Sequence, residues 1–166
     1  ANRSIRWLPT IGWRPMPSSK RSGASSTRDK RRKRRVFFVD RSIGRHIAVA
    51  ALRAAGYEVI AHDDRFPQST LDEEWLPEAG RSGWIVITRD KMIRRRQNEL
   101  EALRVAKVIA FVVTAGSATG DEVAAMLVKH ADRMIDLATG TRPPAVFSLS
   151  RSEPPKRLAL PRARRR

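Results

Sequence analysis

Residues 83–90 read GWIVITRD, and this stretch decides the fold that the sequence predicts. The run 85–87 is wholly apolar, which is typical of a strand buried on both faces of a parallel sheet. It ends in Thr-Arg-Asp, so an acid, Asp90, follows closely. Residues 36–39, VFFV, form a second run of this kind and also end on an acid, Asp40. Because ligands of open parallel sheets bind beyond the carboxyl ends of the strands, we expect both aspartates at that edge.

The remaining elements alternate between strand and helix. Further strands are predicted at residues 57–61, 107–113 and 145–149, and helices at 43–55, 72–81, 97–105 and 119–137. The apolar side of the first helix is formed by Ile47, Ala50, Ala51 and Ala54. The polar stretch 62–65 is predicted to be a loop. Because alternating strands and helices form right-handed crossover units, we expect a three-layer α/β/α fold with a mostly parallel central sheet.

The net charge of +17 is concentrated at the two ends of the chain. Residues 1–35 contain 12 Lys and Arg against one acid, and residues 151–166 contain seven against one. The part between them is charge-balanced and long enough for one domain with its own core. We therefore expect a disordered basic leader (1–35), a folded domain (36–150) and a disordered basic tail (151–166). Such ends are typical either of solvated extensions without a binding role or of electrostatic arms that bind nucleic acid through its phosphates without sequence preference.

Several classes of protein are excluded or disfavoured by the composition. The chain has no cysteine, which excludes disulfides, thiolate metal ligands and cysteine nucleophiles. No apolar run reaches the roughly 20 residues that span a bilayer, so we expect a cytoplasmic protein without a membrane partner. There is neither a Walker-type loop nor a Rossmann glycine fingerprint. The histidines at 46, 62 and 130 are scattered, and only His62 has an adjacent acid, Asp63.

Three acids form the candidate site: Asp40, Asp72 and Asp90. Asp72 opens a predicted helix, and the other two follow strands. Carboxylates gathered at one edge would repel each other, and a hard divalent cation such as Mg²⁺ or Mn²⁺ resolves that conflict. Such ions are the usual means of cutting phosphodiesters. Each acid also has a structural alternative: Asp40 as a helix cap, Asp72 as a favourable charge at a helix start, and Asp90 as a turn residue.

Five short stretches together resemble the PIN-like ribonucleases. They are residues 37–44, 72–76, 83–91, 93–96 and 99–100, and the resemblance extends over 36–150. It is greatest for the small bacterial PIN-like proteins related to VapC-type toxins. The pattern that carries it is an acid after the first strand, an acid that opens a helix containing a small residue (Ala79), and Thr-x-Asp after a later strand.

The resemblance implies a metal-dependent endoribonuclease that hydrolyses RNA phosphodiester bonds with Mg²⁺ or Mn²⁺. It implies Asp40, Asp72 and Asp90 as catalytic residues and metal ligands. It further implies that the protein is the toxin of a toxin–antitoxin pair. The cognate antitoxin would then cover the acidic pocket with an Arg or Lys side chain. Toxin domains of this size often pair with themselves, so a homodimer is a further expectation. The family usually has another acid between the first and the third. The candidates for that place are Asp63, Asp64 and Glu73.

Basic residues beside the predicted site are candidates for contact with RNA. They are Arg41, Arg89, Lys91, Arg94, Arg95 and Arg96. The run 94–96 is equally typical of a phosphate-binding segment and of a solvated turn. Trp75 and Trp84 are more typical of core anchors than of platforms on which bases stack.

Two other classes of function stay open. In the first, the protein is a non-catalytic nucleic-acid-binding protein that uses its basic ends, and the acids are vestigial. In the second, it is a receiver-like signalling domain, because these domains also gather aspartates around Mg²⁺. A receiver needs a Lys on a late strand, and neither Lys107, at the start of a strand, nor Lys129, on a helix, fits that place well.

Overall fold

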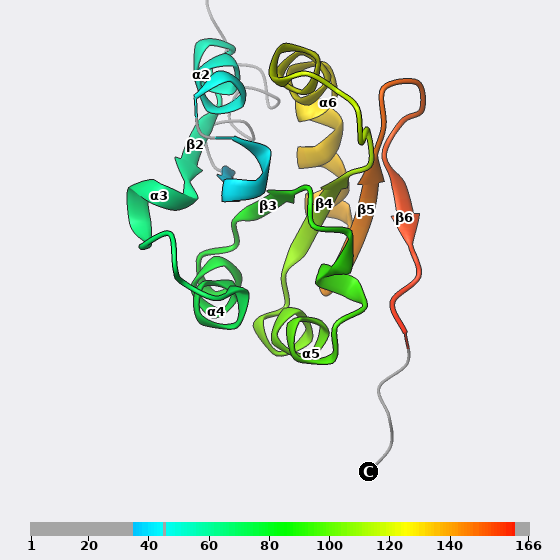
Figure 1. The fold of residues 1–166 in the computed structure, drawn as a ribbon. Coiled ribbons are helices and arrows are strands. Elements are labelled where there is room, and N and C mark those ends of the chain that lie inside the picture. The colour runs from blue at the N-terminus through cyan, green and yellow to red at the C-terminus, as the bar shows by residue number, and fades with distance from the viewer. Residues whose placement is uncertain (1–34, 45, 162–166) are drawn as a thin grey trace, which may run out of the picture.

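The structure is a computed structural model of the chain, and it describes residues 35–44 and 46–161. A six-stranded sheet forms its centre, with the strand order β2-β1-β3-β4-β5-β6 (Figure 1). The strands are β1 Val36–Val39, β2 Glu58–Ala61, β3 Ile85–Thr88, β4 Ile109–Val113, β5 Ala145–Leu149 and β6 Lys156–Leu158. The first five are parallel, and β6 runs antiparallel to β5. The predicted basic leader lies outside the described residues, apart from Arg35.

Helices cover both faces of this sheet. They are α2 Ile47–Ala54, α3 His62–Arg65, α4 Asp72–Ser82, α5 Gln97–Ala106 and α6 Gly120–Gly140, with short 3-10 turns η1 Arg41–Ile43 and η2 Lys91–Arg94. α2 packs beside α6 on one face, and α4 packs beside α5 on the other (Figure 1). The predicted three-layer α/β/α fold is therefore confirmed. None of the helices in the described part of the chain is long and apolar enough to cross a membrane.

Two hydrophobic cores, one on each face, explain why the strand sequences are apolar throughout. In β1, Phe37 and Val39 point into the core under α2 and α6, and Phe38 points into the core under α4 and α5. In β3, Ile85 and Ile87 enter the first core, whereas Val86 enters the second. Burying one such side chain stabilises the fold by about 1.5–3 kcal/mol, so the side chains on both faces of each strand stabilise the sheet between its two layers of helices. The buried Trp75 and Trp84 are core anchors, as predicted.

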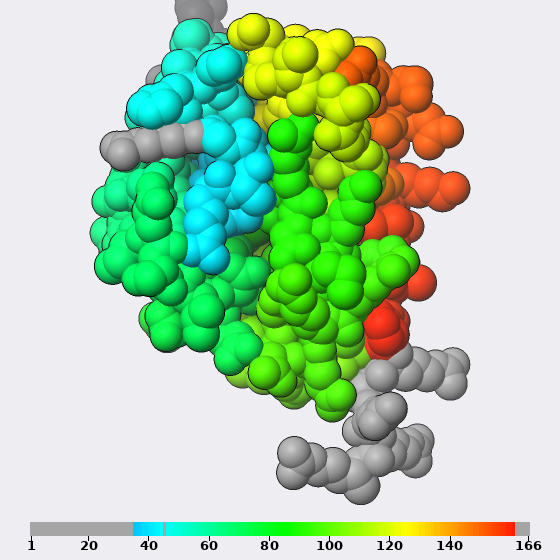
Figure 2. Space-filling model, in the orientation of Figure 1, coloured from blue at the N-terminus to red at the C-terminus, as the bar shows by residue number. Residues whose placement is uncertain are grey.

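The strand order reverses between β1 and β3, and this reversal positions the site. From β1 the chain passes through α2 to β2 at one side, and α4 then returns it to β3 at the other side. The carboxyl ends of β1 and β3 are therefore neighbours, and the backbone N–H of Asp40 donates to the carbonyl of Ile87 at 2.9 Å. The segments that follow these two strands lie side by side on the surface in Figure 2. Ligands of open α/β sheets bind at such a point.

The first helix differs from its prediction in extent and in its buried face. Instead of one helix over 43–55, the chain forms η1, breaks at Gly44 and begins α2 at Ile47. Gly44 has φ 92, a left-handed conformation that favours glycine. The break resets the helical phase, so Ile47 is 47% exposed and Ala50 and Ala54 are exposed as well. The buried residues of α2 are Ala48, Val49 and Leu52.

Two other boundaries differ from the prediction. Residues 62–65, expected as a loop, form the single helical turn α3, with His62 buried. The fold also extends past residue 150, because β6 pairs with β5 and Leu158 and Leu160 pack against the core under α4 and α5. This segment was predicted to be a tail because of its charge, yet a short basic strand is a common way to protect the edge of a sheet.

Gly80 tests the close packing of α4 on α5. A Cβ atom at Gly80 would lie 1.8 Å from the carbonyl oxygen of Ala106, whereas one at Gly140, in α6, would meet nothing within 4 Å. We expect Gly80→Ala to lower the free energy of unfolding by about 2 kcal/mol or more in urea denaturation. Gly140→Ala is the control and should be neutral or stabilising by about 0.5–1 kcal/mol. Equal stability of the two variants would contradict the close contact.

Candidate functional site

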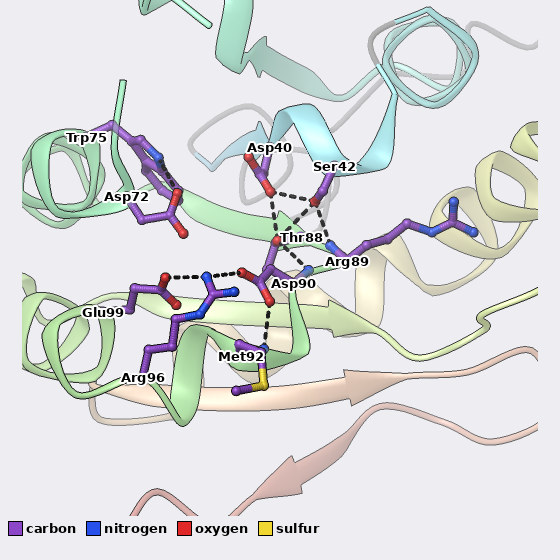
Figure 3. Close-up of polar contacts among 10 residues, drawn as sticks. All are labelled: Asp40, Ser42, Asp72, Trp75, Thr88, Arg89, Asp90, Met92, Arg96 and Glu99. Atoms are coloured by element: carbon purple, nitrogen blue, oxygen red, sulfur yellow. Dashed lines mark hydrogen bonds and ion pairs between the residues drawn. The ribbon is translucent and has the colours of Figure 1, made fainter. Parts of the chain in front are cut away.

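Asp40 is the most buried acid of the site, and two hydroxyl groups hold its carboxylate (Figure 3). Its side chain follows β1 and is 5% exposed. Ser42 Oγ donates to Asp40 Oδ2 at 2.5 Å, and Thr88 Oγ1 donates to the same oxygen at 2.8 Å. A buried carboxylate needs such partners because burial removes its water. Neither of these two bonds uses the second oxygen, Oδ1.

The same two hydroxyls hold the backbone that follows β3. The N–H of Arg89 donates to Ser42 Oγ at 2.9 Å, and the N–H of Asp90 donates to Thr88 Oγ1 at 3.0 Å. Asp90 in turn accepts from the N–H of Met92 at 2.7 Å through Oδ1. Thr88 is thus bonded both to the carboxylate of Asp40 and to the backbone of Asp90. It sets the relative position of the two acids, which is the supporting role that its sequence position indicated.

Asp72 lies at the first position of α4, where a negative charge is favoured by the helix dipole. Its Oδ1 accepts a hydrogen bond from Trp75 Nε1 at 3.1 Å. Burial raises the pKa of Asp72 above its ordinary value of 3.8, and the charge of Asp40 raises it further. The charge of Glu99 acts in the same direction, whereas the Trp75 bond and Arg41 lower the pKa. The site therefore contains mutually repelling carboxylates.

Glu99, near the start of α5, completes the group. One of its oxygens, Oε1, accepts from Arg96 at 2.7 Å. The other, Oε2, is buried and has no hydrogen-bond partner among the residues that the structure describes. A buried carboxylate oxygen without a partner is destabilising, and a bound cation would remove that penalty.

One carboxylate oxygen each from Asp72, Asp90 and Glu99 lie within 4.8 Å of one another, and we call these three residues the acidic cluster. An ion with oxygen ligands at about 2.0–2.5 Å keeps those oxygens within about 4–5 Å of each other. All-oxygen donors suit Mg²⁺ or Mn²⁺. The cluster and the unpartnered Glu99 oxygen thus fit a hard divalent cation.

Arg96 is a partial counter-ion for the acidic cluster. Its guanidinium lies 2.7 Å from Glu99 Oε1 and 3.4 Å from Asp90 Oδ2, between the two side chains in Figure 3. The Arg96 side chain is 56% exposed, so these ion pairs are open to solvent and weak. Arg96 orients Glu99 through Oε1 and leaves Glu99 Oε2 without a hydrogen-bond partner among the described residues.

The structure brings the three predicted acids together and adds one. Asp72 and Asp90 belong to the acidic cluster, and Asp40 is close enough to raise the pKa of Asp72. Glu99 was part of a stretch that carried the family resemblance but was not predicted to be a site residue. The signal that could have found it is its place in the first turn of a helix that begins seven residues after Asp90.

The three candidates for a further acid lie outside the acidic cluster. Asp63 contacts His62 at 3.2 Å and Gln68 at 3.3 Å. Asp64 forms an ion pair with Arg53 at 3.0 Å. Glu73 is exposed on α4, pointing away from the core. Glu99, and none of these three residues, is therefore the further acid that lies beside Asp72 and Asp90.

Most of the predicted RNA-binding residues have structural partners. Arg89 donates to the carbonyls of Ala115 and Ala118, Arg94 to that of Ala159, and Arg41 to that of Gln68. Arg96 is bonded to the acids, as described above. Lys91 and Arg95 are exposed, and their side chains make no polar contact among residues 35–44 and 46–161. These two residues are therefore the most available to a phosphate beside Asp90.

A family of known domains matches this part of the chain. Residues 35–115 match the family model described as a PIN like domain. The chain therefore contains a PIN-like domain, and the resemblance inferred from the sequence is confirmed at that level. The matched region runs from β1 to β4 and holds Asp40, Asp72, Asp90 and Glu99. PIN-like domains are generally nucleases that use divalent metal ions. Searches of curated proteins and of solved structures returned no match.

The raised pKa of Asp72 predicts how stability depends on pH without metal. The folded protein holds the Asp72 proton more tightly than the unfolded chain, so stability is lost as pH rises from 3.8 through the raised pKa. We expect Asp72→Asn to raise the Tm in EDTA at pH 7 and to reduce this decline. The variant should also lose most of the Tm gain that Mn²⁺ gives to the unmodified protein.

Thermal unfolding between pH 4 and 8, with EDTA and with Mn²⁺, measures both effects. Glu73→Gln is the matched control, because Glu73 is the next residue of α4 and is exposed. An Asp72→Asn variant with the pH profile and the Mn²⁺ response of the unmodified protein would contradict both the raised pKa of Asp72 and its part in holding a cation.

Proposed function

We propose that this protein is a metal-dependent endoribonuclease that hydrolyses RNA phosphodiester bonds with Mg²⁺ or Mn²⁺. The observation that carries the proposal is the buried, unpartnered Oε2 of Glu99, within a cluster that also contains Asp72 and Asp90. The cluster lies at the carboxyl edge of a sheet in a PIN-like domain, a class that is generally nucleolytic. A bound divalent ion would lower the pKa of the attacking water and neutralise charge on the scissile phosphate.

The chain's own residues have distinct roles in this proposal. Asp72, Asp90 and Glu99 hold the ion. Asp40, whose Oδ2 is fixed by two hydroxyls, contributes Oδ1 as a further ligand or as the acceptor of a proton from water. Arg96 keeps Glu99 oriented, and such supporting contacts of a metal site affect both affinity and activity. Lys91 and Arg95, exposed after Asp90, contact RNA phosphates.

We extend the proposal to biological role: the nuclease is the toxin component of a toxin–antitoxin pair. The support is the sequence resemblance to VapC-type proteins, which covers the same residues that hold the acids. A cognate antitoxin would present an Arg or Lys to the acidic cluster, where Arg96 already shows that a guanidinium can pair with Asp90 and Glu99. Self-association as a homodimer and a cytoplasmic location stay predictions.

The second candidate function is that of a receiver-like signalling domain, which the strand order also supports. The order of the parallel strands, β2-β1-β3-β4-β5, is that of the flavodoxin-like folds, which include receivers. The site argues against it. Lys107 directly follows α5, and Lys129 lies exposed on α6, whereas the residue that follows β5 is Ser150. Neither lysine follows a late strand, so the phosphate of an acyl-phosphate would lack that partner.

The nuclease proposal is tested with variants of two acids of the cluster and with a control on the same helix as Glu99. We expect Glu99→Gln to lower Mn²⁺-dependent cleavage of mixed single-stranded RNA by about 100-fold, the upper end of the effect of losing a metal-site partner. Asp90→Asn should have an effect of the same size. Glu101→Gln is the control, since this side chain is 63% exposed and pairs only weakly with Arg104, at 3.8 Å.

The readout is gel electrophoresis of the RNA, with Mn²⁺ and with EDTA. Cleavage that persists in EDTA, or that is unchanged in Glu99→Gln and Asp90→Asn, would refute the metal mechanism. If the unmodified protein binds RNA but never cuts it in Mn²⁺, the result would support the non-catalytic RNA-binding alternative.

A further inference from the structure

A groove opens beside the acidic cluster, at the carboxyl ends of β1 and β2. Its volume is about 590 Å³, and it is lined by Arg41, Ser42, His46, Asp63 and Gln68. Ser42 belongs both to the groove and to the network that holds Asp40. Arg41 also lies near both sites, because its charge lowers the pKa of Asp72. The groove therefore adjoins the candidate nuclease site.

A buried histidine orients the acid of this groove. His62 is 1% exposed and lies among the rings of Phe38, Phe66 and Trp75. Its Nδ1 lies 3.2 Å from Asp63 Oδ1, and its Nε2 has no hydrogen-bond partner among the described residues. Nδ1 is thus placed to donate a proton to Asp63 Oδ1. His62 therefore fixes the orientation of the Asp63 carboxylate, the acid that follows it in the sequence.

Asp63 is held from both sides but keeps acceptor capacity. Its Oδ2 accepts from Gln68 Nε2 at 3.3 Å, while Oδ1 contacts His62. Each carboxylate oxygen has two acceptor positions, so one position remains on each oxygen. The Asp63 side chain is 15% exposed and lines the groove. The groove thus contains a fixed carboxylate with two adjacent acceptors.

The ligand that matches this carboxylate is a guanine base. RNA-binding proteins read unstacked bases through hydrogen bonds to their Watson–Crick edges. Guanine presents two adjacent donors there, N1–H and N2–H, whereas uracil presents one and adenine and cytosine present an amino group beside an acceptor. The guanidinium of Arg41 donates to the Gln68 carbonyl and keeps further N–H groups for a phosphate. The groove volume lies within the range of small-ligand pockets, about 300–1,000 Å³.

We propose that this groove is a guanosine-nucleotide subsite, in which Asp63 reads the base and Arg41 holds a phosphate. In the context of the proposed nuclease function, it selects a guanosine next to the bond that is cut. Only that second statement rests on the proposed function, because nucleotide binding needs neither metal nor cleavage.

Binding of the four ribonucleoside 5′-monophosphates to the full-length protein in EDTA tests the subsite. We expect guanosine monophosphate to bind about tenfold more tightly than uridine monophosphate in an NMR titration, as one bidentate base contact gives. Asp63→Asn should reduce that ratio to near one. Because all four nucleotides carry the same charge, the basic ends of the chain affect them equally.

Asp64→Asn is the matched control. Asp64 is the next residue, but it pairs with Arg53 and does not line the groove, so the guanosine preference should remain. Arg41→Gln, at an exposed position, should weaken the binding of all four nucleotides alike and leave the ratio of their affinities unchanged. Equal binding of the four nucleotides, or a preference that survives in Asp63→Asn, would overturn the proposal.

Cleavage of a random RNA library separates the two proposals. We expect guanosine to be enriched at one position beside the cut, and Asp63→Asn to lose this enrichment. Cleavage without any guanosine enrichment would remove the subsite and leave the nuclease. A protein that binds guanosine monophosphate selectively but cuts nothing would keep the subsite and lose the nuclease.

Discussion

The double hydroxyl contact on Asp40 Oδ2 is the interaction on which the arrangement of the site depends. Ser42 and Thr88 each donate to that oxygen, and each accepts a backbone N–H from the segment after β3. One carboxylate thereby connects the ends of β1 and β3 through Asp40 and Thr88, which are 48 residues apart in sequence. Each hydroxyl both donates and accepts a hydrogen bond, so the positions of the two hydroxyls are well defined. The network thereby fixes the backbone of Asp90 relative to the carboxylate of Asp40.

The acids around this contact are held in spite of their mutual repulsion. Burial and neighbouring charges raise the pKa of Asp72, and one oxygen of Glu99 has no partner among the described residues. Arg96 relieves only part of this, from a solvent-exposed position. A fold optimised for stability alone would have neutral or apolar side chains here. Such conflicts are expected where a site binds a ligand, and a bound cation would relieve this one.

The parts of the fold that the sequence predicted are those in which local pattern and tertiary role coincide. Apolar runs ending on acids placed β1 and β3 and the two aspartates after them. What could not be predicted depends on contacts between distant elements. The glycine break at Gly44 changed the phase of α2, and the pairing of β6 depends on β5. Glu99 joins the site only because α5 begins at the same edge as β3 ends, a relation that no single stretch of sequence contains.

The contact at Gly80 links helix packing to the choice of cation. Asp72 and Glu99 stand at the starts of α4 and α5, and the backbones of these two helices approach closely where Gly80 faces Ala106. Mg²⁺ and Ca²⁺ differ mainly in radius and in the cavity that each requires. A methyl group at Gly80 would push these two helices apart at their carboxyl ends, and any tilt that resulted would change the gap between the two acids at the other ends.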